Sequence, residues 1–342
     1  MLQYFSKYKP TYYGGCKDLL IHTTCFITSF YSMWYFRDSY LSLLTIPLQS
    51  LMILRTFIIF HDCGHNSYTP NKRLNYVIGS ILGIFVNTPF CWNYDHHYHH
   101  LTSGNKDSLA FWDFSGQFFV DHSNQNETVN KTLKDYNEMG NMKYIYRILR
   151  DPLVFFTVVP PLIFFIKYRC NELLIKYNND NAYKTSINII LFDTILNNLG
   201  IFLLFMHMDS DIIYHYLISQ TIAFSIGLMI FHNEHTFNPP YVVTEEKWNK
   251  KDSGLLGSSF IQVPNYLRFF TLAAEYHHIH HANSSIPGYN LPQLHEELKK
   301  NTNELDNIIE LSMNDFYKNL WLTLYDEENN KYISFAEADK VK

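Results

Sequence analysis

Long apolar runs separated by polar segments dominate the chain, and their lengths predict helices that cross a membrane. A transmembrane helix needs about 20 predominantly apolar residues. Four runs approach or reach this length: residues 19–36, 41–60, 187–206 and 212–231. The pattern therefore predicts an all-α integral membrane protein with four transmembrane helices plus interfacial helices. Three polar residues within the third run are expected to face the interior of the helix bundle: Asp193, Asn197 and Asn198.

Two shorter apolar runs predict helices that enter or lie on the membrane without crossing it. Residues 75–90 are short for a span, and residues 152–168 contain the adjacent Pro160 and Pro161, which lack backbone N–H donors. We interpret residues 75–90 as re-entrant or interfacial and residues 152–168 as interfacial. Arg55 interrupts the second long run near its end, where its side chain is expected to extend to the interface.

Polar segments divide the chain into three parts. Residues 1–18 are expected to form a cytosolic tail, residues 19–295 a membrane domain, and residues 296–342 a charged cytosolic cap. Residues 101–150, which contain no long apolar run, are expected to add a second soluble segment to this cap. Loops rich in Lys and Arg stay on the cytosolic side. Four cations mark that side before the third span: Lys167, Arg169, Lys176 and Lys184.

Composition agrees with a membrane protein. Aromatic residues make up 17% of the 342 residues, which suits aromatic belts at the membrane surfaces. The mean hydropathy is only −0.16, because most residues lie outside the apolar runs. A net charge of −5 argues against nucleic acid as a partner. The five cysteines are scattered and form no C-x-x-C motif, so they indicate neither disulfides nor a structural zinc site.

Histidines with helical spacing form three motifs near the ends of the predicted helices. Side chains at i, i+3 and i+4 share one face of a helix. HDCGH supplies an i, i+4 pair, and DHHYHH and HHIHH each contain H-x-x-H-H; the histidines are His61 and His65, then His96, His99 and His100, then His277, His280 and His281. Imidazole clusters of this kind are typical ligands of Fe, Zn, Cu or Ni. The motifs therefore predict a transition-metal site.

Chance does not account for this repetition. With 17 His in 342 residues, a random H-x-x-H-H should occur only ~0.04 times. One site also requires all three motifs on the same side of the membrane, so an even number of spans must separate the second from the third. This condition selects residues 187–206 and 212–231 as spans and leaves residues 152–168 interfacial. Their 207–211 connection, without Lys or Arg, would lie on the opposite side.

The three motifs resemble the histidine boxes of the integral-membrane fatty-acid desaturases. The resemblance covers roughly residues 40–335 and includes WNYDHHYHHLTSGN, YRILRDPLVFFTVVPPLIFFIKYR, LLGSSF, EYHHIHHANSSIPGYNLPQLHEE and LTLYDEENNKYISF, which look like the acyl-lipid Δ12/ω-type branch. It implies a fatty-acid desaturase that inserts a cis double bond into a long acyl chain, of Δ12/ω-6 or ω-3 type. O2 and two external electrons would be used at a di-iron centre held in the cytosolic helical cap.

The resemblance also implies the ligands of two Fe ions. His235 in HNEHTF matches an additional histidine of the family, whereas His232 lacks this support, and we interpret it as an interfacial residue with ligation as the alternative. The nine implied ligands are His61, His65, His96, His99, His100, His235, His277, His280 and His281. Outside the motifs stand His22, His122, His207, His215 and His295.

Four residues beside the boxes are candidates for supporting roles. Asp62, Asp95 and Glu275 are candidate acceptors for the outer N–H groups of ligating imidazoles, with a helix cap as an equal alternative for Asp95. Trp92 lies four residues before His96 and resembles a tryptophan of the family at that place. We expect it to pack against the substrate or its own helix.

Two other functions share parts of this pattern. A di-iron hydroxylase of alkyl chains or sterols would use similar ligands, but the segments after the second box and around IPGYNLP favour desaturation. A membrane metal transporter also carries H-x-x-x-H on its helices. Transport sites, however, lie near the bilayer midplane, whereas these boxes adjoin polar residues outside the predicted spans.

The sequence has no cytochrome b5-like H-P-G-G segment, so we expect an external electron donor, cytochrome b5 or ferredoxin. The expected substrate is a membrane lipid or acyl-CoA, and the expected location is the endoplasmic reticulum membrane or its equivalent, with the boxes on the cytosolic face. Three N-x-S/T sequons begin at Asn126, Asn130 and Asn283. Because they adjoin the boxes, we predict that none is glycosylated.

Overall fold

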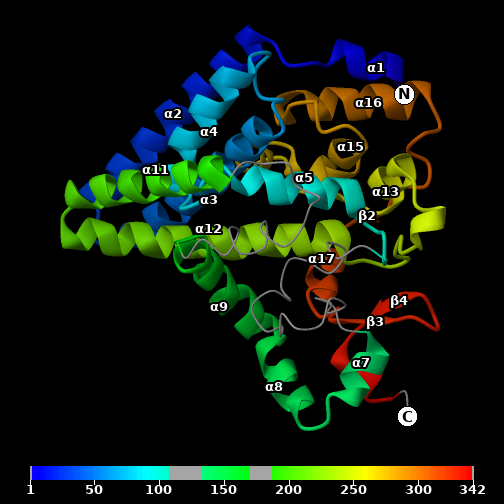
Figure 1. Cartoon of the computed structure of the whole chain (residues 1–342). Coiled ribbons are helices and arrows are strands. Elements are labelled where there is room, and N and C mark those ends of the chain that lie inside the picture. Colours follow the sequence, from blue (N-terminus) through cyan, green and yellow to red (C-terminus); the bar gives the residue numbers. More distant parts are fainter. Residues whose placement is uncertain (1, 108–131, 170–186, 341–342) are drawn as a thin grey trace.

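Helices predominate in the computed structural model, which describes residues 2–107, 132–169 and 187–340 (Figure 1). The longer helices are α2 (Tyr12–Tyr35), α3 (Ser42–Gly64), α4 (Lys72–Phe85), α5 (Trp92–Thr102), α9 (Pro152–Phe165), α11 (Ile187–Met206), α12 (Ser210–His235) and α16 (Leu291–Asn301). The shorter ones are α1 (Leu2–Lys7), α7 (Leu133–Glu138), α8 (Met142–Leu149), α13 (Lys250–Leu256), α14 (Arg268–Thr271), α15 (His277–Ala282), α17 (Met313–Asn319) and α18 (Phe335–Ala338). Single 3-10 turns are η2 (Lys167–Arg169), η3 (Glu245–Lys247), η4 (Ala274–Tyr276) and η5 (Gly288–Asn290). The prediction of a mainly helical protein is confirmed.

Two small two-stranded sheets form in the part of the chain after α12. β1 (Phe260–Ile261) pairs in parallel with β2 (Glu310–Leu311), and β3 (Leu324–Asp326) pairs antiparallel with β4 (Lys331–Ile333). The expected C-terminal helical cap therefore also contains β-strands. In Figure 1 these elements lie at the opposite end of the molecule from the loop that joins α11 to α12.

Four helical segments in the described residues are long and apolar enough to cross a membrane: Ser42–Gly64, Pro152–Arg169, Ile187–Met206 and Ser210–His235. Their number equals the predicted number, but one member differs. α2 has 24 residues, yet polar residues such as Lys17 and Asp18 lower its hydropathy. Pro152–Arg169, expected to be interfacial, meets the criteria instead. Which of the two crosses the membrane stays a prediction.

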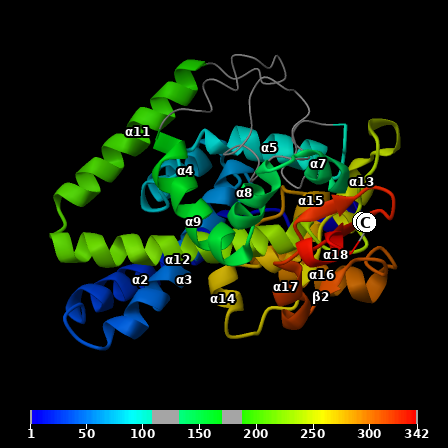
Figure 2. The ribbon, with the colours of Figure 1, turned by 90° about the horizontal axis from the view of Figure 1, so that it is seen from below.

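The two adjacent prolines do not interrupt α9. Pro160 and Pro161 both lie inside a continuous helix, although each lacks the N–H group that a helix interior normally uses. α9 packs along α12, where Phe164 stacks on Phe224 with ring centroids 3.8 Å apart. Packing against a neighbouring helix can maintain a helix that has lost backbone hydrogen bonds. Figure 2 shows α9 beside α12 from a second direction.

Both predicted interfacial segments lead into the helix bundle. At the end of α4 the carbonyl oxygen of Phe85 accepts hydrogen bonds from Tyr216 and Gln220 of α12. η2 follows α9 and places Arg169 against the middle of α11, where its guanidinium donates to the side-chain oxygens of Asn197 and Asn198, both at 2.7 Å. These contacts pack the end of α4 against α12 and η2 against α11, and the interfacial placement of both segments stays a prediction.

The polar residues of α11 lie where the sequence predicted. Asp193 and Asn197 are each only 3% exposed, and Asp193 accepts a hydrogen bond from the Tyr76 hydroxyl of α4 at 2.5 Å. Asn197 donates to the carbonyl oxygen of Thr88, 3.2 Å away. Hydrogen bonds to α4 and to the segment after it therefore satisfy the polar groups that the apolar surroundings would otherwise leave unpaired.

The position of the Arg55 side chain differs from the prediction. Its side chain does not extend to the interface but is 3% exposed inside the bundle, paired with Asp18 of α2. It also donates to the carbonyl oxygen of Phe269 and stacks on that ring, with its guanidinium carbon 4.3 Å from the centroid. The Tyr68 hydroxyl donates to the second Asp18 oxygen at 2.9 Å. A buried partner that is distant in sequence thus replaces the expected contact with water.

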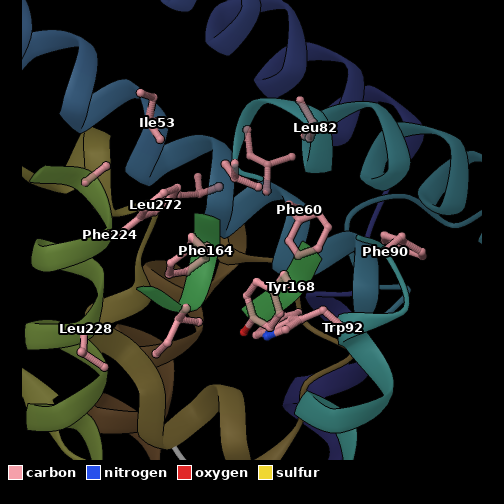
Figure 3. Packing of buried hydrophobic residues seen from close by; sticks show 14 of the residues in the cluster. Ile53, Phe60, Leu82, Phe90, Trp92, Phe164, Tyr168, Phe224, Leu228 and Leu272 are labelled. Carbon is pink, nitrogen blue, oxygen red and sulfur yellow. The ribbon is translucent and has the colours of Figure 1, made fainter. Parts of the chain in front are cut away.

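Aromatic side chains fill the space between α3, α5 and α12 (Figure 3). Phe60 of α3, Trp92 of α5, and Phe164 and Tyr168 from the α9–η2 segment gather there. Each ring buries a large apolar area, which stabilises the contact between distant helices. This cluster adjoins the histidine motifs.

The N-terminal segment is not a free tail. α1 lies beside α16, where Lys7 forms an ion pair with Glu297 at 2.8 Å and the Tyr8 hydroxyl donates to the same carboxylate at 2.6 Å (Figure 1). The expected soluble tail therefore packs against the segment that follows the third histidine box.

Candidate metal centre

Four helices bring the histidine motifs together. The C-terminal end of α3 supplies His61 and His65, and the C-terminal end of α12 supplies His235. α5 and α15 supply the two H-x-x-H-H motifs. Because these motifs are helical, their i and i+4 side chains point the same way, as the spacing predicted.

The nine predicted histidines form two groups in space. Within each group, one nitrogen from every ring lies within 4.8 Å of the others. Group one consists of His61, His65, His96, His100 and His280; group two consists of His99, His235, His277 and His281. Each group therefore resembles a set of ligands for one metal ion.

Ring nitrogens face one another inside each group. In group two the Nε2 atom of His235 lies 3.1 Å from Nε2 of His99 and 3.0 Å from Nε2 of His277. Group one repeats this arrangement around Nε2 of His100, with distances of 3.0 and 3.2 Å. A neutral imidazole has one donor and one acceptor nitrogen, so a nitrogen facing two others cannot satisfy both by hydrogen bonding. Nitrogens that converge on one point are what metal ligation requires.

Burial keeps these imidazoles neutral. Desolvation, followed by repulsion from neighbouring histidines, lowers the pKa of His96, His277 and His280 well below the ordinary value of 6.5. The pKa of His99 falls to about 4 for the same reasons. Neutral imidazole is the form that binds a metal, because its lone pair is free.

Two buried ring nitrogens support the fit to metal ions. The Nε2 atoms of His65 and His281 have no hydrogen-bond partner among the residues that the structure describes. Burying a polar atom without a partner costs free energy. A metal ion in each group would satisfy these atoms, so the donor set fits two metal ions.

In each group, a carboxylate lies close to the outer ring nitrogen of one histidine. Asp62 Oδ1 lies 3.4 Å from His61 Nδ1, and Asp62 Oδ2 accepts the backbone N–H of Gly288 at 2.7 Å. Glu234 Oε2 lies 3.4 Å from His277 Nδ1. Sequence reasoning named Asp62 but missed Glu234. The available signal was its place in HNEH, a polar run that ends an apolar helix.

The other candidates occupy different positions. Trp92 stacks on His96, with centroids 4.6 Å apart and planes 12° apart, so it packs against its own helix as expected. Asp95 is half-buried at the cavity wall. Glu275 accepts a hydrogen bond from Thr271 at 2.7 Å and lies 3.8 Å from Arg268, rather than behind a histidine of either group.

Histidines outside the nine are held by other contacts. His232 Nε2 lies 2.9 Å from the carbonyl oxygen of Asn319, and its ring contacts Phe156, so it lies outside both groups. His278 points away from the site, with Nε2 3.3 Å from His295 Nδ1. His22 is buried beside Thr56. Five residues named above lie outside the described residues: His122, Asn126, Asn130, Lys176 and Lys184.

An apolar cavity of about 230 Å³ adjoins both groups. Its walls come from α3, α9, η2 and α12, and its lining includes Phe57, Phe164 and Leu228. His61 and His277 line the same cavity. The apolar part of this lining suits a hydrocarbon chain that reaches both histidine groups.

Comparison with known proteins agrees with this geometry. The sequence model of one family, described as fatty acid desaturase, matches residues 38–308. This range covers most of the chain and includes all nine histidines. The chain belongs to the fatty acid desaturase family.

Several relatives of this desaturase carry related names. A fatty acid desaturase of Bacillus subtilis is 29% identical over 336 residues, which cover 95% of this chain and 88% of the relative. An sn-1 oleoyl-lipid 12-desaturase of Picosynechococcus sp. is 24% identical over 289 residues, 83% of this chain and 76% of that protein. An endoplasmic reticulum omega-3 fatty acid desaturase of Vigna radiata is 29% identical over a shorter stretch of 98 residues, 28% of this chain and 24% of that protein.

Family membership carries two conclusions for the desaturase. It implies an oxidoreductase of lipid metabolism. Together with the four apolar helices, it also indicates a membrane protein. The family resemblance read from the histidine boxes is thus confirmed.

Proposed function

We propose that this desaturase inserts a cis double bond into a long acyl chain, using O2 and two external electrons at a di-iron centre. The observation that carries the proposal is the pair of histidine groups at the wall of an apolar cavity. An apolar cavity without the histidine groups would not indicate this reaction, and neither would the histidine groups without the cavity.

Group one and group two would each hold one Fe ion through Nε2 or Nδ1 atoms of the nine histidines. Iron is preferred because of the family, since imidazole ligands by themselves also suit Zn, Cu or Ni. When bound, two irons supply the power to activate O2 and remove hydrogen from unactivated CH2 groups, which no side chain provides.

The protein's own residues position the substrate and exclude water. The aromatic and aliphatic lining of the cavity offers an alkyl chain dispersion contacts and few polar alternatives. Trp92, stacked on His96, would fix both the first ring of the second box and one side of the cavity. Asp62 would hold His61 by its outer nitrogen.

The preferred substrate is an acyl chain on a membrane lipid, with acyl-CoA as the alternative. The relative from Picosynechococcus sp. is named for an oleoyl lipid and position 12. That name supports a Δ12 or ω-type reaction on lipid-bound chains here.

We further propose that both groups face the cytosol from a multi-pass protein in the endoplasmic reticulum or an equivalent membrane. The span ends that carry His61 and His235 lie at one end of the bundle, and α1 and α16 lie at that same end (Figure 1). A cytosolic cytochrome b5 or ferredoxin would deliver the electrons there.

Expression in a yeast that lacks polyunsaturated fatty acids tests the proposal. Gas chromatography and mass spectrometry of total fatty acids should reveal a new product with one more double bond, and separation by lipid class should locate it on membrane lipids. A strain expressing the His61→Ala, His235→Ala double variant is the matched control. A hydroxylated product would support the hydroxylase alternative, and an unchanged profile with normal protein levels would contradict the proposal.

A further inference from the structure

Glu234 occupies a position that the motif spacing does not explain. It precedes His235 at the end of α12, and its side chain is 4% exposed. Its Oε2 atom lies 3.4 Å from Nδ1 of His277, the first histidine of the third box. The corresponding contact in group one, between Asp62 and His61, has the same length.

The orientation of the His277 ring determines which of its nitrogens faces Glu234. Nε2 of His277 lies 3.0 Å from Nε2 of His235, inside group two, so Nδ1 on the other side of the ring faces Glu234. A carboxylate only accepts hydrogen bonds, so it would hold the ring proton on Nδ1 and leave the lone pair on Nε2. That tautomer is the one that can bind a metal within group two.

The charge of Glu234 is also uncompensated by nearby cations. Among the described residues, neither lysine nor arginine forms an ion pair with it. Burying a carboxylate without a cation is costly. A divalent metal held by His277 would supply the missing positive charge.

We propose that Glu234 is a positioning residue for the metal of group two. It fixes the tautomer and orientation of His277 and, through its negative charge, strengthens metal binding by that group. This inference rests on the proposed function in one respect, namely that both histidine groups bind metal. It adds the residue that stabilises the second metal, as Asp62 would stabilise the first.

The test uses the full-length protein in detergent, freed of metal and titrated with Co²⁺, whose visible absorption reports each occupied histidine group. The wild type should bind two Co²⁺ per chain. In Glu234→Gln one of the two sites should weaken by about 10- to 100-fold while the other keeps its affinity, because outer carboxylates contribute that much to metal binding. Glu234→Asp, which keeps the charge, should recover part of the loss.

Glu275→Gln is the matched control. Glu275 is also a buried carboxylate, 1% exposed, but it contacts Thr271 and Arg268 instead of a histidine of either group. It should keep both Co²⁺ affinities. An equal loss in Glu275→Gln would attribute the effect to any buried charge and overturn the inference.

Thermal unfolding separates metal binding from folding. Without metal, Glu234→Gln should be at least as stable as the wild type, since the substitution removes a buried charge that has no cation. A lower midpoint for the metal-free variant would indicate a purely structural role. Two unchanged Co²⁺ sites in Glu234→Gln would overturn this inference alone, whereas a wild type that binds no Co²⁺ would overturn the proposed function as well.

Discussion

α5 and α15 carry the same H-x-x-H-H spacing, yet they serve the two histidine groups in opposite ways. α5 directs its i and i+4 histidines, His96 and His100, to group one and its i+3 histidine to group two. α15 directs its i and i+4 histidines, His277 and His281, to group two and its i+3 histidine to group one. The two helices therefore exchange one ligand each.

This exchange shows what the repeated spacing achieves. An i, i+4 pair lies one above the other on a helix, whereas the i+3 side chain is displaced around the helix. Two helices packed together can thus provide two paired sites and join them through His99 and His280. Each motif therefore contributes to both histidine groups rather than to one.

The largest loss of activity is expected when the two exchanged histidines, His99 and His280, are replaced. His99→Ala and His280→Ala should both abolish product, because each leaves one group incomplete. Their metal defects should differ, with group two emptied in the first variant and group one in the second. Product analysis in yeast, combined with metal per chain by mass spectrometry, checks both statements.

His97 offers a control on the same helix. It is exposed on α5 and belongs to neither group, so His97→Ala should keep wild-type product levels. Wild-type product from His99→Ala or His280→Ala would refute the ligand assignment.

A second prediction concerns the histidine that α12 adds to group two. His235→Ala should abolish product, since this Nε2 lies between those of His99 and His277. His232→Ala should keep most activity and lower the free energy of unfolding by about 0.5–1.5 kcal/mol, the usual contribution of one hydrogen bond. Product profiles and thermal unfolding of the purified variants measure these effects. Equal loss of product in both would show that HNEH contributes two ligands.

A smaller effect, on stability, is expected from changes to Trp92, which stacks on His96. Trp92→Phe keeps an aromatic face against His96, so it should cost about 1 kcal/mol of stability. Trp92→Ala leaves a cavity and should cost about 3–5 kcal/mol. Chemical denaturation of both variants tests this order, and similar losses would mean that the stacked ring contributes little.

The last prediction is that Asn283 is not glycosylated. If α5 and α15 face the cytosol together, Asn283, which directly follows α15, stays unmodified when the protein is made in a eukaryotic secretory membrane. A sequon engineered into a lengthened 207–211 loop should acquire glycan instead. A mobility shift removed by a glycosidase reports modification. Glycan at Asn283 would place the third box on the lumenal side and contradict the common face of the two helices.

The histidines were predictable because their positions depend on helical spacing within short segments. All nine lie in the two groups, and His278, which falls between the spaced positions, points away toward His295. The exchange of His99 and His280 was not predictable. It depends on how α5 and α15 pack, and no local pattern records that packing.

Other contacts escaped the sequence because their partners are distant or because context changed a local preference. Arg55 was expected at the interface, but Asp18, 37 residues earlier, pairs with it inside the bundle. Pro160 and Pro161 disfavour a helix in isolation, yet α9 continues through both against α12. Glu234 was not named from the sequence, since only the fold brings His277 to it.

The packing of α1 on α16 sets an order for biosynthesis. Lys7 and Glu297 are 290 positions apart, so their ion pair forms only after nearly the whole chain has left the ribosome. The ligands of group two likewise extend from His99 to His281. The helices that contain the first two boxes are therefore synthesised before either group is complete. Until His280 and His281 have been synthesised, each group lacks at least one of its histidines.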